Sequence, residues 1–422
     1  MPEALILLSM VGIFALLAMV FKLPIGISLA SAAISGALLG GEGLALRHLV
    51  EGAFGYFETI LIILSAMIFM KVLQGSGILD SVTAVLLKTF YRKKISLLLT
   101  VMVLIMFPGM ITGSSTAAVL TTGVLIAPVL IRLGLSKVKA AALIAMGAIL
   151  GMIAPPVNIL VMIMGSGVDM PYVGLTLPLL IIVVPLAVIF SLWLGYKDIK
   201  IIGYDELESI LPESVFSSYG FRLYLPLFAV LALLLGQNLL DEVFPDIGIP
   251  AIFLFGSIVG KYCGRPLRFL KITQEAVKEA MPILSILVGV GMFIQIMTLT
   301  GGRGWAVISF LSLPPVLLYL GIGISMPLFG AVSAYGSASI LGVPFILALI
   351  NKNAIITAAA LSAIAGLGDL MPPTALAGMF AAQVVGEKNY FLVLRHCIVP
   401  AFFELSVGIG VLLLAPILDK II

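Results

Sequence analysis

The sequence predicts an all-α polytopic membrane protein, and two observations indicate this fold class. First, 62% of the 422 residues are hydrophobic and only 10% are charged, with a mean hydropathy of +1.26. A soluble domain of this size needs far more polar surface. Second, the apolar residues form long unbroken runs, such as the one at 177–196. A membrane β-barrel would instead show segments of about ten alternating residues.

The composition also excludes several functions. Cys263 and Cys397 are too few for a disulfide framework, and no Cys/His spacing suggests a metal site. No residue pattern supports hydrolytic or redox catalysis, so we expect no enzyme and no organic cofactor. The net charge of +3 comes from loop residues and gives no indication of nucleic-acid binding. The N-terminus has no basic region or cleavage site, so we expect its first apolar run to be a retained span.

Hydropathy and helix breakers predict an order of segments that occurs twice. In the first half we expect spans at 4–22, 24–40 and 54–73, a weak amphipathic stretch at 78–91, short segments at 95–110 and 115–132, a Pro-broken span at 138–164 and a span at 174–196. In the second half we expect spans at 222–240, 249–262 and 281–299, a weak stretch at 304–311, short segments at 314–330 and 333–349, a broken span at 354–385 and a span at 398–418.

This order predicts two repeats of about five spans each, 1–196 and 222–422, joined by a charged linker at 197–221. Each repeat would contribute scaffold spans (4–73 and 222–299), a helical hairpin (95–132 and 314–349) and a Pro-broken helix (138–164 and 354–385). A shared motif supports the two repeats, because the pattern G-x-x-x-P-P occurs at Gly151–Pro156 and again at Gly368–Pro373. A proline, Pro108 or Pro327, precedes the pair by 47 or 45 residues and leads into a cluster of small residues.

Basic residues predict the orientation. Both outer ends of the 95–132 pair are basic, so the positive-inside rule places both in the cytoplasm and makes the pair a re-entrant hairpin. The same rule places both termini outside and leaves only four basic residues facing outward: Arg47, Arg303, Lys352 and Lys420. The second hairpin then begins from the opposite side, and the two repeats are inverted relative to each other.

The proline pairs predict ion sites at the middle of the membrane. Each pair removes two backbone donors and frees carbonyl groups, which cost several kcal/mol each in hydrocarbon if they stay unpaired. A sodium ion bound by these carbonyls and nearby hydroxyls would compensate, and the half-helix N-termini would suit an anionic group. We expect the first hairpin tip to face the first break and the second tip the second break. The candidate residues are Gly113, Ser114, Ser115, Thr116, Gly151, Pro155, Pro156 and Asn158 in the first repeat, and Ser333, Gly336, Ser337, Ser339, Gly368, Asp369, Pro372, Pro373 and Thr374 in the second.

Four of these are the candidate sodium ligands: Ser115, Asn158, Ser337 and Asp369. Three roles stay open for Asp369, namely a sodium ligand, a protonatable coupling group and a cap on the half-helix near Pro372. Small residues in membrane helices also serve close packing, and a lone proline can be only a kink. We expect Glu58 and Glu404 to be interfacial or helix-pairing groups, because their positions do not match between the repeats.

The chain resembles the large membrane subunit (DctM) of tripartite ATP-independent periplasmic (TRAP) transporters, within the ion-transporter superfamily of elevator carriers. The resemblance rests on "LPIGISLASAA", "GSSTAAVLTTGVLIAPVLIRLGLSKVKAAALIA" and "GMIAPPVNILVMI". It implies that Gly113, Ser114, Ser115, Ala117, Pro155 and Pro156 hold sodium and line the substrate site. The second half departs from the family pattern, because Asp369 stands in a break that is usually apolar.

The resemblance further implies a multi-pass protein of a bacterial or archaeal cytoplasmic membrane. Its expected activity is sodium-coupled uptake of a small organic anion, such as a C4-dicarboxylate or a sugar acid, by an elevator mechanism. Its expected partners are the lipid bilayer, a small four-span membrane subunit and a periplasmic solute-binding protein. The alternatives are proton coupling, a standalone sodium/proton antiporter, a carboxylate carrier without a binding protein, and the membrane subunit of a sodium-pumping decarboxylase.

Overall fold

The computed structural model describes residues 1–239, 247–349 and 351–420. Within these ranges the chain forms helices and no β-strand, which confirms the predicted all-α fold class. Eight helices of this part are long and apolar enough to cross a membrane, judged by length and composition. The protein is therefore a multi-pass membrane protein.

The helices form two series along the chain, one before the linker and one from the linker onward. Before the linker they are α1 (Glu3–Ala15), continued by η1 (Leu16–Val20), α2 (Ile25–Gly40), α3 (Leu46–Phe54), α4 (Phe57–Gly75), α5 (Ile78–Phe90), α6 (Lys94–Thr112), α7 (Ser115–Ala118), η2 (Val119–Gly123), α8 (Val124–Arg132), α9 (Lys137–Ile153), α10 (Ile159–Gly167) and α11 (Thr176–Gly195). From the linker onward they are α12 (Tyr204–Ile210), α13 (Phe216–Tyr219), η3 (Gly220–Tyr224), α14 (Leu225–Leu239), α15 (Ile249–Cys263), α16 (Phe269–Leu299), α17 (Gly302–Leu311), α18 (Pro315–Gly330), α19 (Ala334–Ser337), η4 (Ala338–Gly342), α20 (Val343–Ala348), α21 (Ala354–Gly366), η5 (Leu367–Leu370), α22 (Leu376–Val384) and α23 (Tyr390–Leu418).

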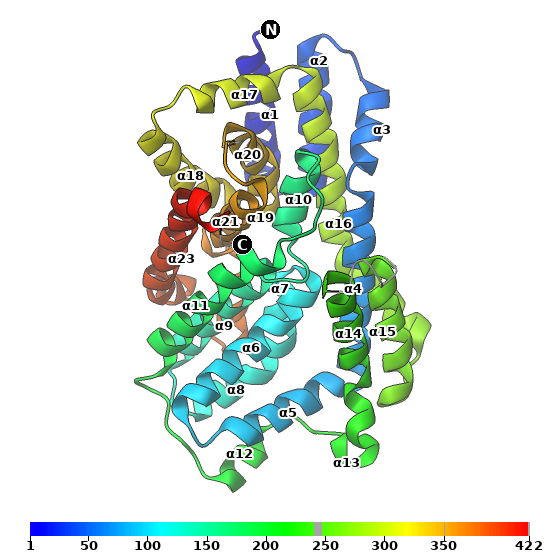
Figure 1. Ribbon diagram of the computed structural model, residues 1–422, viewed down its shortest axis with the longest axis vertical. Helices are drawn as coiled ribbons and strands as arrows, with labels where there is room; N and C mark the ends of the chain where they lie inside the picture. Colours follow the sequence, from blue (N-terminus) through cyan, green and yellow to red (C-terminus); the bar gives the residue numbers. More distant parts are fainter. Residues whose placement is uncertain (240–246, 350, 421–422) are drawn as a thin grey trace.

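One group of helices, which we call the scaffold group, consists of α1–α4 and α14–α16. The long helix α16 packs along α2, α3 and α4, and Figure 1 shows it, in yellow-green, running beside α2 and α3. Helix α4 also packs against α15. The scaffold group therefore combines helices from both halves of the chain.

Glycines allow α16 to approach its neighbours closely. A Cβ atom added to Gly291 would lie 1.9 Å from the carbonyl oxygen of Gly52 in α3, and one added to Gly289 would lie 2.4 Å from that of Gly26 in α2. Neither position has room for a larger residue unless the backbone moves. Small residues at such crossings let membrane helices gain van der Waals contact, which is the packing energy available in lipid.

The second group, which we call the hairpin block, consists of α6–α10 and α18–α22. Helix α9 of the first half packs against α22 of the second, and α10 packs against α21. The remaining long helices, α11 and α23, pack against α9 and α21. Figure 1 shows this block beside the scaffold group, with α18 and α23 on its outer side.

Three helices outside the linker differ clearly from the predicted spans: α3 was not predicted, and α16 and α23 begin earlier than expected. Helix α3 occupies part of the stretch between the predicted second and third spans, α16 begins at Phe269 rather than 281, and α23 begins at Tyr390 rather than 398. The first turns of α16 carry Lys271, Glu275, Lys278 and Glu279. Hydropathy finds the apolar part of a helix, whereas polar turns at its ends leave no such signal.

The linker is helical in part and is attached to the bundle at several points. Glu208 in α12 pairs with Lys88 of α5 at 2.5 Å, Glu213 pairs with Arg265 after α15 at 3.2 Å, and Asp198 pairs with Lys139 of α9. The backbone N–H of Lys200 also donates to Leu133 O at 2.7 Å. The stretch 197–221 therefore lies against both groups of helices.

Candidate functional site

The first hairpin turns at a glycine and a serine. Helix α6 ends at Gly113, whose φ of +63° belongs to the left-handed region. A Cβ at Gly113 would lie 2.5 Å from Cγ1 of Ile159, so the position also lacks space for a side chain. The Ser114 side chain then caps α7 by accepting a hydrogen bond from Ala117 N at 3.2 Å. A π-helical turn, η2, opens the second arm.

The first break separates α9 from α10, and residues 154–158 between them are not helical. Asn158 caps α10 by accepting from Val161 N at 3.1 Å, and its amide group donates to Ile153 O at 2.8 Å. The backbone N–H of Val157 donates to Met110 O of the hairpin at 3.1 Å. The predicted helix interruption at Pro155 and Pro156 is thus present and is bonded to its own hairpin.

The second hairpin has the same features, formed by different residues. Ser333 caps α19 by accepting from Gly336 N at 3.1 Å, and the π-helical turn η4 follows. Ser337 donates to Met326 O of the opposite arm at 2.8 Å, whereas Ser339 donates to Gly336 O at 2.9 Å. The hydroxyl groups of Ser337 and Ser339 therefore donate within the hairpin, not to the second break.

The second break comprises the 3-10 turn η5 and residues 371–375, between α21 and α22. The backbone N–H and the hydroxyl group of Thr374 both donate to Ala331 O at the second hairpin tip, at 3.2 Å and 2.8 Å. The peptide bonds Pro155–Pro156 and Pro372–Pro373 are both cis. This break is also bonded to its own hairpin.

Glycine contacts fasten each hairpin to the first glycine of its G-x-x-x-P-P motif. A Cβ at Gly109 would lie 2.8 Å from the carbonyl carbon of Gly151, and one at Gly330 would lie 2.7 Å from the Cα of Gly368. The same backbone-to-backbone approach thus occurs in both halves. Close packing alone therefore explains why Gly151 and Gly368 are glycines, without a role in binding substrate or ion.

Three contacts join the two halves at the centre of the block. The Ser115 hydroxyl donates to the Asp369 carboxylate, although 254 residues separate the two in sequence. Tyr335 donates to Gly113 O at 3.1 Å, and the Asn158 amide donates to the Ser362 hydroxyl at 3.0 Å. Ser115 and Asp369 are 2% and 5% exposed, so their contact is closed off from the surface. The first tip thus meets the second break as well as its own.

Two tyrosines, which are not among the residues predicted from the sequence, donate hydrogen bonds to carbonyl groups at the breaks. Tyr172 donates to Pro156 O at 3.0 Å and accepts from Asn158 N at 2.9 Å, and Tyr390 donates to Leu370 O. Part of the hydrogen bonding lost at each break is therefore restored by the protein itself. The tyrosines follow the second proline of their pair by 16 and 17 residues, which is the signal that could have identified them.

Among the four predicted sodium ligands, the structure brings Ser115 and Asp369 together. The Asn158 side chain already forms hydrogen bonds through its oxygen and its nitrogen, and Ser337 lies on the opposite hairpin with its proton on Met326 O. The Asp369 carboxylate and the Ser115 hydroxyl are oxygen donors of the kind that sodium binds in broken membrane helices. They form the part of the predicted set that fits an ion.

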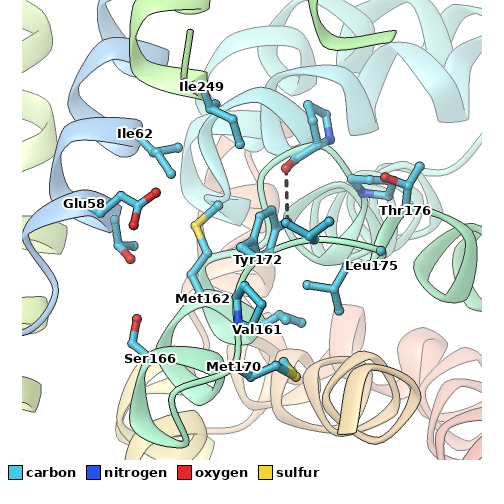
Figure 2. Close-up of a pocket in the computed structure, with 18 of the residues that line it drawn as sticks. Glu58, Ile62, Val161, Met162, Ser166, Met170, Tyr172, Leu175, Thr176 and Ile249 are labelled. Atoms are coloured by element: carbon cyan, nitrogen blue, oxygen red, sulfur yellow. Dashed lines mark hydrogen bonds between the residues drawn. The ribbon is translucent and has the colours of Figure 1, made fainter. Parts of the chain in front are cut away.

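A cavity of about 480 Å³ lies between the scaffold group and the first break (Figure 2). Its scaffold wall includes Glu58, Thr59 and Ile62 of α4, together with residues of α14 and α15, and its block wall includes Pro155 and Pro156. The remaining block wall comes from α10 and from the segment 170–176. Figure 2 shows Glu58 directed toward this space, opposite Tyr172. Glu58 thus faces the cavity between the two groups of helices.

Glu404 also differs from expectation. It is fully buried on α23, and neither carboxylate oxygen has a hydrogen-bond partner in the described part of the chain. Within the described ranges, its carboxylate therefore forms no hydrogen bond to a neighbouring helix. Its neighbouring helices α9, α11, α21 and α22 are almost entirely apolar.

Two solved structures of membrane transporters are similar to this fold. The YdaH transporter of Alcanivorax borkumensis matches with a TM-score of 0.62 and 15% identity, over 87% of this chain and 88% of that one. MtrF of Neisseria gonorrhoeae, described with a class of antimetabolite efflux pumps, matches with a TM-score of 0.58 and 14% identity, over 87% and 83%. At these identities the likeness shows the fold alone, a bundle of membrane helices that this chain shares with both proteins.

The sequence assigns the chain within this class. Residues 10–416 match the model of the DctM component of tripartite ATP-independent periplasmic transporters, and the chain belongs to this family. None of the curated proteins matches the sequence. Family membership confirms the resemblance drawn from the hairpin and break motifs and makes the protein a TRAP-type secondary transporter.

Proposed function

We propose that this protein is the large permease subunit of a TRAP system that couples sodium to the uptake of a small organic anion. The observation that carries the proposal is the buried Ser115–Asp369 contact. It joins a hairpin tip from one half to a helix break from the other, where unwound backbone and oxygen-bearing side chains lie together. Membrane carriers bind coupling ions at such places.

An elevator mechanism is the form of alternating access that the packing supports. Both hairpins and both broken helices belong to one block, and the scaffold group packs mainly within itself through α16, α2 and α3. Among the described residues, few hydrogen bonds join the two groups of helices. One runs from the Tyr56 hydroxyl, next to α4, to Ile163 O of α10, at 3.0 Å. In the proposed cycle, the block carries ion and substrate past the scaffold group and breaks this bond.

The proposed partners are a small four-span membrane subunit and a periplasmic solute-binding protein, which family membership supports. Uptake into proteoliposomes tests the function: labelled carboxylates are offered under an inward sodium gradient, with and without both partners. Sodium-driven uptake that needs the binding protein is expected. Uptake of no organic anion under a sodium gradient would overturn the proposal.

Cross-linking tests the elevator motion separately. After replacement of Cys263 and Cys397, a bifunctional thiol reagent is applied to the pair Tyr56→Cys and Ile163→Cys, which bridges scaffold and block. The cross-linked protein should lose transport. The matched control pair, Val72→Cys and Gly260→Cys, lies within the scaffold group, where a Cβ at Gly260 would be 2.8 Å from Val72. Transport that survives the first cross-link would contradict the mechanism.

A sodium/proton antiporter is a second candidate, which the same buried Asp369 supports. A carboxylate that alternates between a proton and sodium could exchange the two ions without an organic substrate. A pH-sensitive dye inside sodium-loaded proteoliposomes separates the candidates. Proton movement in the absence of any carboxylate would favour the antiporter.

A further inference from the structure

The cavity between α4 and the first break has the size and lining of a small-molecule site. Its volume of about 480 Å³ lies within the range of roughly 300–1,000 Å³ that is typical of ligand pockets. Apolar side chains form much of the lining, namely Ile62, Val161, Met162, Met170, Leu175 and Ile249. These residues come from both the scaffold group and the block, so an occupant would touch both.

The charged side chain at the wall of this cavity is negative. Glu58 is its one acidic lining residue, and no Lys, Arg or His is found among the described residues that line it. The Glu58 carboxylate forms no ion pair or hydrogen bond within the described ranges, unlike Glu51, Glu208, Glu213 and Glu279, which each pair with a basic side chain. Glu58 is exposed, so its carboxylate is solvated in the absence of a ligand and is available to pair with a cationic group that enters the cavity.

The other polar groups at the wall are neutral. They are the hydroxyl groups of Thr59, Ser166, Tyr172 and Thr176 and the amide of Gln237. The Tyr172 hydroxyl is already bonded to the break, as the dashed line in Figure 2 shows. An organic dianion placed here would face one negative charge with no positive side chain to balance it, whereas an ammonium group would be stabilised by Glu58.

We propose that this cavity binds the ammonium group of a zwitterionic carboxylate, an amino acid or a close analogue, with Glu58 as the specificity-determining residue. The ammonium group lies at Glu58, and the apolar part of the molecule packs against Met162, Met170 and Ile62. This inference rests on the proposed uptake of carboxylates. It narrows the substrate class to carboxylates that also bear an ammonium group, which excludes simple dicarboxylates as the preferred substrates.

Binding of matched compounds to the purified protein in lipid nanodiscs tests the inference. The probes are the common proteinogenic amino acids, each paired with the carboxylic acid that lacks the amino group, such as L-leucine with 4-methylpentanoate and L-aspartate with succinate. A charge-assisted contact corresponds to about a tenfold or larger change in Kd. At least one amino acid should therefore bind tenfold or more tightly than its deaminated partner.

The variant Glu58→Gln keeps the shape of the side chain and removes its charge. It should weaken binding of that amino acid by about tenfold and leave the deaminated acid unchanged. The matched control is Glu42→Gln, an exposed glutamate outside the cavity. Size-exclusion chromatography checks that both variants remain folded.

Three results would overturn the inference: no amino acid binds, the deaminated acid binds as tightly as its partner, or Glu58→Gln changes neither. The uptake assay distinguishes this failure from failure of the proposed function. If sodium drives uptake of a carboxylate and Glu58→Gln leaves its selectivity intact, the inference alone fails. If sodium drives no uptake at all, the proposed function fails.

Discussion

Ser115, at the tip of the first hairpin, donates a hydrogen bond to Asp369, in the break of the second half. Each hairpin is also bonded to the break of its own half, through Met110 and Val157 or through Ala331 and Thr374. The Ser115–Asp369 bond therefore links the first hairpin to the second break, in addition to the bonds that join each hairpin to its own break. Because of these bonds, displacement of either hairpin tip would also displace residues at both breaks. Coupling between ion and substrate binding requires such a connection.

Replacement of Asp369 by Asn should remove the charge at this crossing while keeping its shape. We expect sodium dependence of uptake to fall by tenfold or more, or its pH profile to flatten, because the amide has no charge and does not titrate. Uptake measured over a range of sodium concentrations and pH checks this. The control Asp205→Asn lies on exposed α12. Unchanged coupling at every pH would remove Asp369 from the mechanism.

Replacement of Ser115 separates the hydrogen bond from the space at the tip. Ser115→Ala should weaken sodium dependence, since a bond to a charged group is worth about 1.5–3 kcal/mol. Ser115→Leu should abolish transport while the protein still inserts, because the site is 2% exposed and has no space for the side chain. Ser406→Leu, on an exposed face of α23, is the control. Retained transport in the leucine variant would count against the tip.

Replacement of Gly291 tests the packing of the scaffold group. In Gly291→Ala the new methyl group would meet Gly52 O, so α3 and α16 must separate, at a cost of about 1–3 kcal/mol for overpacking. A lower melting temperature in detergent is expected. The control Gly12→Ala places a methyl group where nothing lies within 4 Å. Equal stability of the two variants would show that the α3–α16 contact can relax.

Replacement of Tyr172 tests whether the protein itself stabilises the first break. Tyr172→Phe removes the hydrogen bonds to Pro156 O and from Asn158 N and leaves both groups unpaired, at a cost of about 1–3 kcal/mol for each buried group. We expect a lower melting temperature, partly recovered at high sodium concentration if an ion binds nearby. The control is Tyr262→Phe, at an exposed tyrosine on α15. A stable variant would mean that water or lipid replaces the hydroxyl.

Replacement of Glu404 asks whether a buried, unpartnered carboxylate has a function. An apolar residue of similar size avoids burying an acid, so Glu404→Leu should be as stable as the parent protein or more stable. Thermal unfolding measures this, and the uptake assay accompanies it. A variant that is stable but inactive would instead assign Glu404 a role in transport.

The fold class and the two breaks could be predicted from the sequence because they depend on local properties. Apolar length reveals a span, and a proline pair interrupts a helix whatever surrounds it. The partners across the site could not be predicted in this way. The bond from Ser115 to Asp369 and the position of Glu58 at a cavity depend on how distant helices pack, and neither residue's local sequence records that arrangement. Ser337 shows the same limit, because its hydroxyl group donates to its own hairpin.

The π-helical turns η2 and η4 give one indication of the history of the chain. Each follows a serine-capped turn and opens the second arm of a hairpin, although the letters "VLTTG" and "ASILG" have little in common. Descent from a single ancestral segment would explain why the main-chain path is shared while the side chains are not. Distant homologues would then be recognised more readily by this backbone irregularity than by residue identity.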